Sequence, residues 1–302
     1  MSKKLMGIIP PMTTPFDNDE NIDTTAFRQE VRYLIDTGVH GVAVGGSTGE
    51  GHTLTTDEIR CLTEIAVEEA AGRIPVITGI IVDSTKQAIE RGLAVADLPV
   101  AALQITPVHY LFAPDDEAMY RHFATIADAV GLPILIYNVI PWSYCSPELL
   151  VRIINEVELV IGVKQSAGDM HALAELLLLL EERGLVMAAV DDLLYPCFTL
   201  GCHGSIAAIL TAVPELCVSL WDSVRQHRHN DALNLHHRLL RVWDAIAGSN
   251  LPACVKCAMN LQGRTGGNTR APMSLASPAQ ESAIRNALQI AEVLNGQTAR
   301  SM

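Results

Sequence analysis

The chain has 302 residues, of which 49% are hydrophobic and 18% are charged, so it can bury a large core and does not resemble a disordered protein. Its formal net charge of −13 argues against a general attraction to nucleic acid or anionic lipid. No apolar run approaches the ~20 residues that span a bilayer, and the first residues lack the pattern of a secretory signal. Seven cysteines in a chain of this size are typical of reduced, buried thiols. We therefore expect a cytoplasmic protein that binds neither nucleic acid nor a membrane.

Short apolar or β-branched runs recur along the first two thirds of the chain and are typical of buried strands. Eight such runs lie at residues 7–10, 42–44, 75–78, 101–105, 133–137, 160–164, 186–190 and 204–207. The segments between them repeat apolar residues at three- and four-residue intervals, which predicts helices over 25–35, 57–71, 86–96, 115–129, 147–156 and 170–182. This alternation predicts parallel strands joined by helical crossovers.

The number of these units predicts the fold. Eight strand and helix units in about 220 residues match a closed TIM (β/α)8 barrel better than an open doubly wound sheet, and no G-x-G-x-x-G follows the first run. From 214 to 247 the pattern is helical without strand signals, and after a polar, Gly-rich stretch at 263–268 another helix is predicted over 278–294. We predict a barrel over 1–225 and a C-terminal helical extension over 226–302 that packs on it.

Active sites of such barrels lie at the C-terminal ends of the strands, so the residue that closes each run is informative. Lys164 closes the run 160–164, which predicts an amine that points into the mouth of an apolar barrel. Burial disfavours the ammonium form and so favours an amine that can form a Schiff base with a ketone. The alternative is a salt-bridged structural lysine. The other four lysines look ordinary in the sequence: Lys3, Lys4, Lys86 and Lys256.

Two further runs end in reactive groups. Ser47 and Thr48 lie between glycines after the second run, where hydroxyls and released backbone N–H groups can bind a small carboxylate. The alternative is a tight turn whose glycines serve only the backbone. Tyr137 closes the fifth run, and its hydroxyl can exchange protons at the carbon beside a Schiff base, although its ring can equally serve only core packing.

Metal sites look poor. Cys254-x-x-Cys257 lacks a second pair at zinc-like spacing and lies in an apolar stretch that reads as a buried helix face. Asp191 and Asp192 follow the seventh run, but adjacent acids generally point apart. Four histidines lie in a polar helical region that reads as a solvated face: His227, His229, His236 and His237. We expect neither a metal nor a cofactor.

Together these residues form a pattern that resembles the dihydrodipicolinate synthase and N-acetylneuraminate lyase superfamily of Schiff-base TIM barrels. The resemblance covers nearly the whole chain. The matching segments are 7–16, Gly46-Ser47-Thr48-Gly49-Glu50, Thr106-Pro107, Tyr137-Asn138-Val139, Gly162-Val163-Lys164 and 200–206, which ends in Gly204-Ser205-Ile206.

The resemblance implies a role for each matching residue. Lys164 would form an imine with pyruvate or another 2-oxo acid, and Tyr137 would move protons at the reacting carbon. Thr48 would hold the carboxylate together with the loop at Gly46, and Ile206 is also assigned to substrate binding. Ser47 would link Tyr137 to a second tyrosine donated by the neighbouring subunit. We assign that second tyrosine to Tyr110, with His109 as the alternative.

Two departures from the family pattern concern the substrate. Dihydrodipicolinate synthases carry an arginine shortly after the Tyr-Asn-Val-Pro stretch to bind the second substrate's carboxylate, but here Trp142 lies at that approximate position. An aromatic ring cannot make the bidentate contact that an arginine gives a carboxylate. Val190 replaces a glycine that usually precedes the Asp-Asp pair, so we expect its larger side chain to narrow the site along that wall.

The main prediction is a metal-independent class I lyase that forms a Schiff base on Lys164 and makes or breaks a carbon–carbon bond beside it, or dehydrates a deoxy sugar acid. One alternative is condensation of pyruvate with aspartate semialdehyde, and another is a non-catalytic, ligand-binding barrel. The resemblance also implies a homo-oligomer, commonly a tetramer built as a dimer of dimers.

Overall fold

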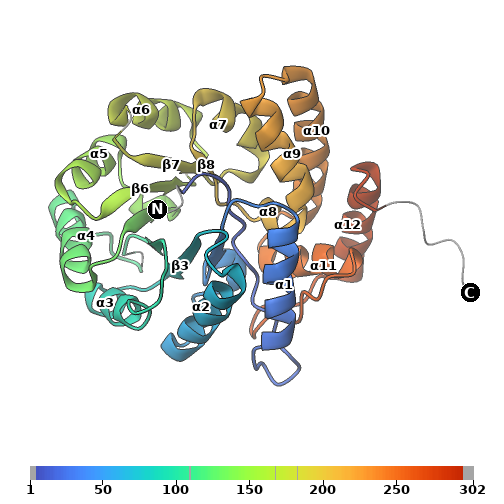
Figure 1. The fold of residues 1–302 in the computed structure, drawn as a ribbon, viewed down its shortest axis with the longest axis horizontal. Coiled ribbons are helices and arrows are strands. Elements are labelled where there is room, and N and C mark those ends of the chain that lie inside the picture. The colour runs from blue at the N-terminus through green and yellow to red at the C-terminus, as the bar shows by residue number, and fades with distance from the viewer. Residues whose placement is uncertain (1–4, 109, 167, 182, 295–302) are drawn as a thin grey trace, which may run out of the picture.

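The computed structural model describes residues 5–108, 110–166, 168–181 and 183–294. Its eight parallel strands form one curled sheet in the order β1-β8-β7-β6-β5-β4-β3-β2 (Figure 1). The strands are β1 (Gly7–Ile8), β2 (Val42–Val44), β3 (Val76–Ile80), β4 (Ala102–Ile105), β5 (Ile134–Asn138), β6 (Val160–Gln165), β7 (Leu185–Ala188) and β8 (Gly204–Ser205).

The chain just after β1 closes the sheet into a barrel. The N–H of Ala43 in β2 donates to the Pro10 carbonyl over 2.9 Å, and the Met12 N–H donates to the Ala43 carbonyl over 2.8 Å. These bonds join the two strands at the ends of the sheet order, so no free edge remains between them. The predicted TIM barrel is confirmed.

Helices cover the outside of the barrel, as the alternating sequence pattern predicts. They are α1 (Thr24–Asp36), α2 (Thr56–Ala70), α3 (Thr85–Leu93), α4 (Asp116–Val130), α5 (Pro147–Glu156), α6 (Met170–Leu180), α7 (Leu194–Leu200) and α9 (Pro214–Arg225), with a short α8 (Ile209–Ala212) before the last. Their first turns are set by local sequence: Thr55 and Glu58 form a capping box at α2, and Ser146 caps α5 ahead of Pro147.

Three short 3-10 helices lie where strands end: η1 (Ser47–Gly49), η2 (Pro141–Ser143) and η3 (Asp191–Leu193). The C-terminal helices α10 (His229–Ile246), α11 (Leu251–Leu261) and α12 (Pro278–Ile290) lie together on one side of the barrel, near α1 and α9 (Figure 1). Helix α11 contacts η1, and α10 contacts η3. The C-terminal helices therefore support two of the loops at the mouth of the barrel.

Several predicted boundaries were wrong. The seventh run was predicted to extend to Val190, but β7 ends at Ala188 and Val190 is the N-cap residue of η3. Helix α3 ends at Leu93 rather than at residue 96. The stretch 214–247 is helical, as predicted, and contains the two helices α9 and α10, between which the chain turns at His227 with a φ of 57°.

Candidate active site

Lys164 and Tyr137 face each other inside the mouth of the barrel. They are partners in the register of the adjacent strands β6 and β5. Only 3% of Lys164 and 5% of Tyr137 is exposed. The Lys164 Nζ atom lies 3.6 Å from the centroid of the Tyr137 ring, so the amine lies against the aromatic face. An ammonium in this position is attracted by the ring's negative face.

An irregularity in β6 turns Lys164 into the barrel. The β5–β6 register shifts, because Ile134 pairs with Val160 but the next residue of β5 pairs with Gly162. Val160 and Val163 belong to the outer apolar cluster between strands and helices, whereas Ile161 packs against the inner cluster. The extra residue thus reverses the alternation of side chains, as a β-bulge does.

Gly162 makes this shift possible. A side chain at this position would place its Cβ 2.2 Å from the backbone carbonyl oxygen of Leu185 in β7. Only glycine allows β6 to lie this close to its neighbour while carrying the extra residue.

The η1 turn places two hydroxyls beside this pair. The Ser47 Oγ atom lies 3.2 Å from the Tyr137 hydroxyl, and Thr48 is buried next to it. The Gly46 carbonyl accepts bonds from the N–H groups of Gly49 and Gly51. Among the hydrogen bonds of the described residues, none uses the N–H of Ser47 or Thr48 as its donor. These two amides and the Thr48 hydroxyl can therefore bind an anion.

Glu50 anchors the turn from below. It is fully buried, has a φ of 56°, and accepts bonds from the Lys256 Nζ over 2.6 Å and from the Arg270 N–H over 2.9 Å. The prediction that Lys256 is an ordinary lysine was wrong, because it is 2% exposed and also donates to the Asn268 carbonyl. Burial lowers the pKa of Lys256, although the charge of Glu50 opposes this. A lone lysine within the apolar run 251–259 was the available signal.

A cavity of about 370 Å³ opens at the mouth of the barrel. Five predicted site residues line it: Ser47, Thr48, Tyr137, Lys164 and Ile206. Other parts of its wall were not predicted, and these include His52, Ser166, Asp191, Leu251, Pro252 and Met273. The last three come from the C-terminal extension, whose contribution to the cavity carries no motif.

Asp191 brings a carboxyl group into this cavity. It begins η3, and its Oδ1 accepts a 2.7 Å bond from the Ile209 N–H. Burial raises the pKa of Asp191 to about 6, whereas the bond from Ile209 and the charge of Lys164 act in the opposite direction. In the sequence it was considered only as a partner of Asp192 for a cation, although its place directly after the seventh run also pointed to the site.

The other predicted residues lie away from the cavity wall. Trp142 is 62% exposed and donates from Nε1 to the Tyr110 carbonyl over 2.8 Å. Tyr110 is 64% exposed, and His109 lies outside the described residues. Val190 is half-buried between Ala189 and Asp191, which do line the cavity. Gly46 contributes its backbone to the η1 turn.

Within the described ranges, no group of three or more histidine, cysteine, aspartate or glutamate side chains is arranged to hold a metal ion. None of the helices described is long and apolar enough to cross a membrane.

A lysine and a tyrosine paired inside a (β/α)8 barrel, with hydroxyl groups and free amides beside them, define the class of Schiff-base lyases. Residues 4–291 match the model of the dihydrodipicolinate synthetase family, and the chain belongs to this family. It is a class I, pyruvate-dependent lyase.

Individual relatives agree over nearly their whole length. A 4-hydroxy-tetrahydrodipicolinate synthase of Methanopyrus kandleri is 32% identical over 292 residues, covering 96% of this chain and 97% of the relative. The structure of dihydrodipicolinate synthase from Thermotoga maritima matches with a TM-score of 0.90 and 27% identity, covering 96% of this chain and 99% of the other. CdNal from Clostridium difficile, in complex with mannosamine, matches with a TM-score of 0.87 and 27% identity, covering 95% and 99%.

Proposed function

We propose that the chain forms a Schiff base between Lys164 and a 2-oxo acid such as pyruvate, and makes or breaks the carbon–carbon bond beside the imine. The observation that carries the proposal is the position of the Lys164 Nζ, 3.6 Å from the Tyr137 ring in a cavity of about 370 Å³. The cavity also holds the η1 hydroxyls, so a carboxylate bound there leaves the adjacent ketone next to the amine.

The chemistry follows from these positions. The Lys164 amine attacks the ketone carbon C2, and the resulting hydroxyl takes the phenol proton of Tyr137 and leaves as water. This gives a protonated imine and leaves Tyr137 as a phenolate. In the cleavage direction, Tyr137 takes the proton of the C4 hydroxyl, the C3–C4 bond breaks, and its electron pair moves to the imine to form an enamine and an aldehyde. Tyr137 then returns the proton to C3, and water releases pyruvate from Lys164. Ser47 positions the Tyr137 hydroxyl through their 3.2 Å contact.

The residues that line the cavity favour one chemical class of second substrate. Among the described residues that line it there is no arginine, and Asp191 adds an acidic group on the side of η3. This supports an aldehyde or sugar-acid partner with hydroxyl groups, which a carboxylate accepts as hydrogen-bond donors, over a partner with a second carboxylate. A related structure, CdNal, holds mannosamine, a polyhydroxylated amine. The same enamine can expel water from a deoxy sugar acid, so dehydration belongs to this proposal.

A second candidate is condensation of pyruvate with aspartate semialdehyde, because relatives such as that of Methanopyrus kandleri are named 4-hydroxy-tetrahydrodipicolinate synthase. The test compares the native protein with Trp142→Arg on pyruvate plus aspartate semialdehyde. If Trp142 takes the place of the carboxylate-binding arginine, the variant should gain activity. An efficient native enzyme would favour the second candidate instead.

The first experiment is borohydride reduction of the protein with pyruvate, followed by peptide mass spectrometry, with Lys164→Ala as the matched control. We expect a pyruvyl adduct on Lys164 that is absent from the variant. If neither pyruvate nor bulkier 2-oxo acids give an adduct while a ligand still raises the melting temperature, the proposal fails and a non-catalytic binding barrel is favoured.

We also propose a homo-oligomer, a tetramer by analogy with the family, in which Tyr110 reaches the site of a neighbouring subunit. Its support is a cluster of exposed apolar side chains at the mouth of the barrel: Tyr110, Leu111, Phe112 and Trp142, which are 62% to 80% exposed. Such a patch is typical of a protein interface. A cytoplasmic location is proposed as well, because five of the seven cysteines are buried thiols, which suits a reducing compartment.

A further inference from the structure

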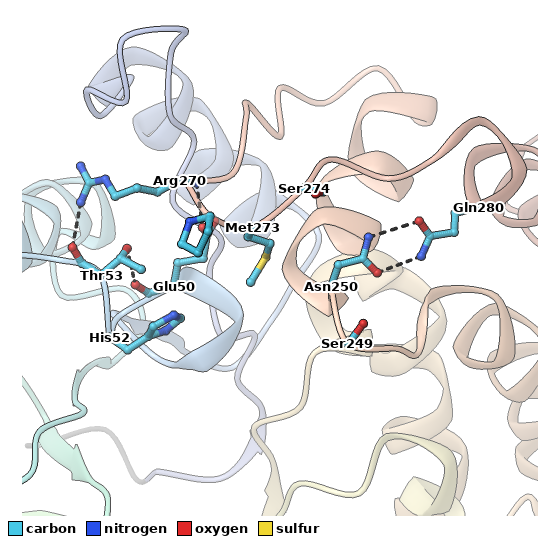
Figure 2. Close-up of a pocket in the computed structure, with 10 residues that line it drawn as sticks. Glu50, His52, Thr53, Ser249, Asn250, Arg270, Met273, Ser274 and Gln280 are labelled. Carbon is cyan, nitrogen blue, oxygen red and sulfur yellow. Dashed lines mark hydrogen bonds between the residues drawn. The ribbon is translucent and has the colours of Figure 1, made fainter. Parts of the chain in front are cut away.

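A second cavity adjoins the candidate active site. It has a volume of about 540 Å³ and lies where the chain after η1, the α10–α11 connection and the loop before α12 meet (Figure 2). His52 and Met273 line this cavity and the one that contains Lys164. The two spaces therefore adjoin at these two side chains, and Figure 2 shows Met273 between the walls that carry His52 and Ser249.

We propose that the second cavity is a distal subsite that binds the uncharged, polyhydroxylated tail of a substrate whose 2-oxo acid end reacts at Lys164. This inference rests on the proposed Schiff-base chemistry and adds the place where the tail of the substrate binds. A tail that continues past Met273 would lie along the wall formed by Ser249, Asn250 and Ser274. Methionine suits a boundary of this kind, because its flexible side chain adapts to different neighbours.

The charges of this cavity are already paired within the protein. The Glu50 carboxylate accepts from Lys256 and from the Arg270 N–H. The Arg270 guanidinium donates two bonds to Glu58, of 3.0 and 2.6 Å, and also bonds the Thr53 and Glu20 carbonyls. A phosphate or carboxylate in the tail would thus have to compete with Glu58 for the guanidinium. This disfavours a charged tail.

The remaining walls offer neutral hydrogen-bonding groups. The side-chain amides of Asn250 and Gln280 form two hydrogen bonds with each other, of 3.2 and 2.8 Å, which fix the Asn250 side chain at the rim (Figure 2). Ser249 and Ser274 add exposed hydroxyls, and His52 adds an exposed imidazole. Such groups donate to and accept from sugar hydroxyls, whereas an aliphatic chain would leave them without partners.

The test measures condensation of pyruvate with three aldehydes: glycolaldehyde, a pentose, and pentanal. Pentanal has the same number of carbons as the pentose but an aliphatic chain without hydroxyl groups. Ser249→Leu and Ser274→Leu each fill the second cavity without touching the first, since both serines line only the second. Ser219→Leu is the control, because Ser219 is exposed on the outer face of α9.

The native protein should prefer the pentose to pentanal in kcat/KM. Each cavity variant should lower the ratio of kcat/KM for the pentose to that for glycolaldehyde by about tenfold or more, chiefly through KM. The control should keep this ratio. A ratio unchanged in both cavity variants, or a native preference for pentanal, would overturn the inference.

Exchange of the pyruvate C3 protons in D2O, measured by NMR on the native protein, separates the two levels of the proposal. This reaction needs only Lys164 and Tyr137. If the native protein exchanges these protons but the ratio of kcat/KM for the pentose to that for glycolaldehyde is unchanged in both cavity variants, only the distal subsite is rejected. Absence of exchange rejects the Schiff-base function, and the subsite with it.

Discussion

The Glu50 carboxylate accepts a 2.6 Å hydrogen bond from the Nζ of Lys256, which follows it by 206 positions in the chain. Both side chains are buried, to 0% and 2% exposure. The pair joins the end of the η1 turn to α11, so the part of the mouth that carries Ser47 and Thr48 is fixed by the C-terminal extension.

We expect Lys256→Met to lower the free energy of unfolding by ~3–5 kcal/mol, because it leaves the Glu50 carboxylate buried without its partner. Lys86→Met is the control, since the Lys86 side chain is 85% exposed, and it should change stability by less than about 0.5 kcal/mol. Urea denaturation measures both variants. The double variant Glu50→Gln, Lys256→Met should recover part of the loss, and no recovery would show that the pair is not the cause.

Tyr137→Phe should keep the borohydride-trapped imine on Lys164 but lower kcat by about 10²- to 10⁴-fold, since the phenol that moves the proton is gone. Ser47→Ala leaves the phenol in place and removes only its 3.2 Å contact, so its loss should be smaller, about tenfold. Borohydride trapping of the imine and kcat, measured on the same samples of both variants, give the comparison. Equal losses in the two variants would remove the distinction between proton transfer and positioning.

Asp191 should make stability depend on pH. Its pKa rises from 3.8 to about 6 on folding, so the folded protein binds the proton more tightly and the free energy of unfolding falls as pH rises between these values. The charged groups that act on it are Lys164 and Asp192. Asp191→Asn removes this pH dependence. The free energy of unfolding of the variant should exceed that of the native protein by almost nothing below pH 4 and by at most ~3 kcal/mol above pH 6. Parallel stability curves for the two proteins would contradict this assignment.

The exposed apolar cluster should hold subunits together. Phe112→Asp places a charge where the side chain is 80% exposed in the single chain, and we expect a smaller sedimenting species at micromolar concentration. Leu93→Asp, at a 52% exposed position at the end of α3, is the control and should leave the mass unchanged. If both variants sediment like the native protein, the subunit contact lies elsewhere.

Much of the fold could be predicted because burial on both faces makes parallel strands read as apolar runs. The direction of Lys164 could not be derived from alternation alone. If side chains alternated strictly from Val160, Lys164 would lie on the outer face of β6, as Val160 does. The register shift at Gly162 moves Lys164 to the inner face. The position of Lys164 at the end of a run made it a candidate Schiff-base lysine, and the resemblance to a family added the 2-oxo acid. The bulge is the physical cause of its inward direction.

The site was only partly predictable for a related reason. Lys164 and Tyr137 are the penultimate residues of β6 and β5, and Ser47 and Thr48 begin the η1 turn after β2, so the barrel rule locates them. Lys256 and Met273 reach the mouth by packing of the extension, and no spacing in the sequence connects them to Glu50 or Lys164. The role of Trp142 stays a prediction, since its ring is exposed and bonded to the Tyr110 carbonyl.

The use of Leu251, Pro252 and Met273 as cavity walls has a consequence for biosynthesis. All eight strands have been translated by Ser205, yet at that stage one side of the cavity does not exist. The strands alone therefore do not enclose a substrate. A shortened chain that stops anywhere between Ser205 and Met273 would contain every strand of the barrel and still lack part of this wall.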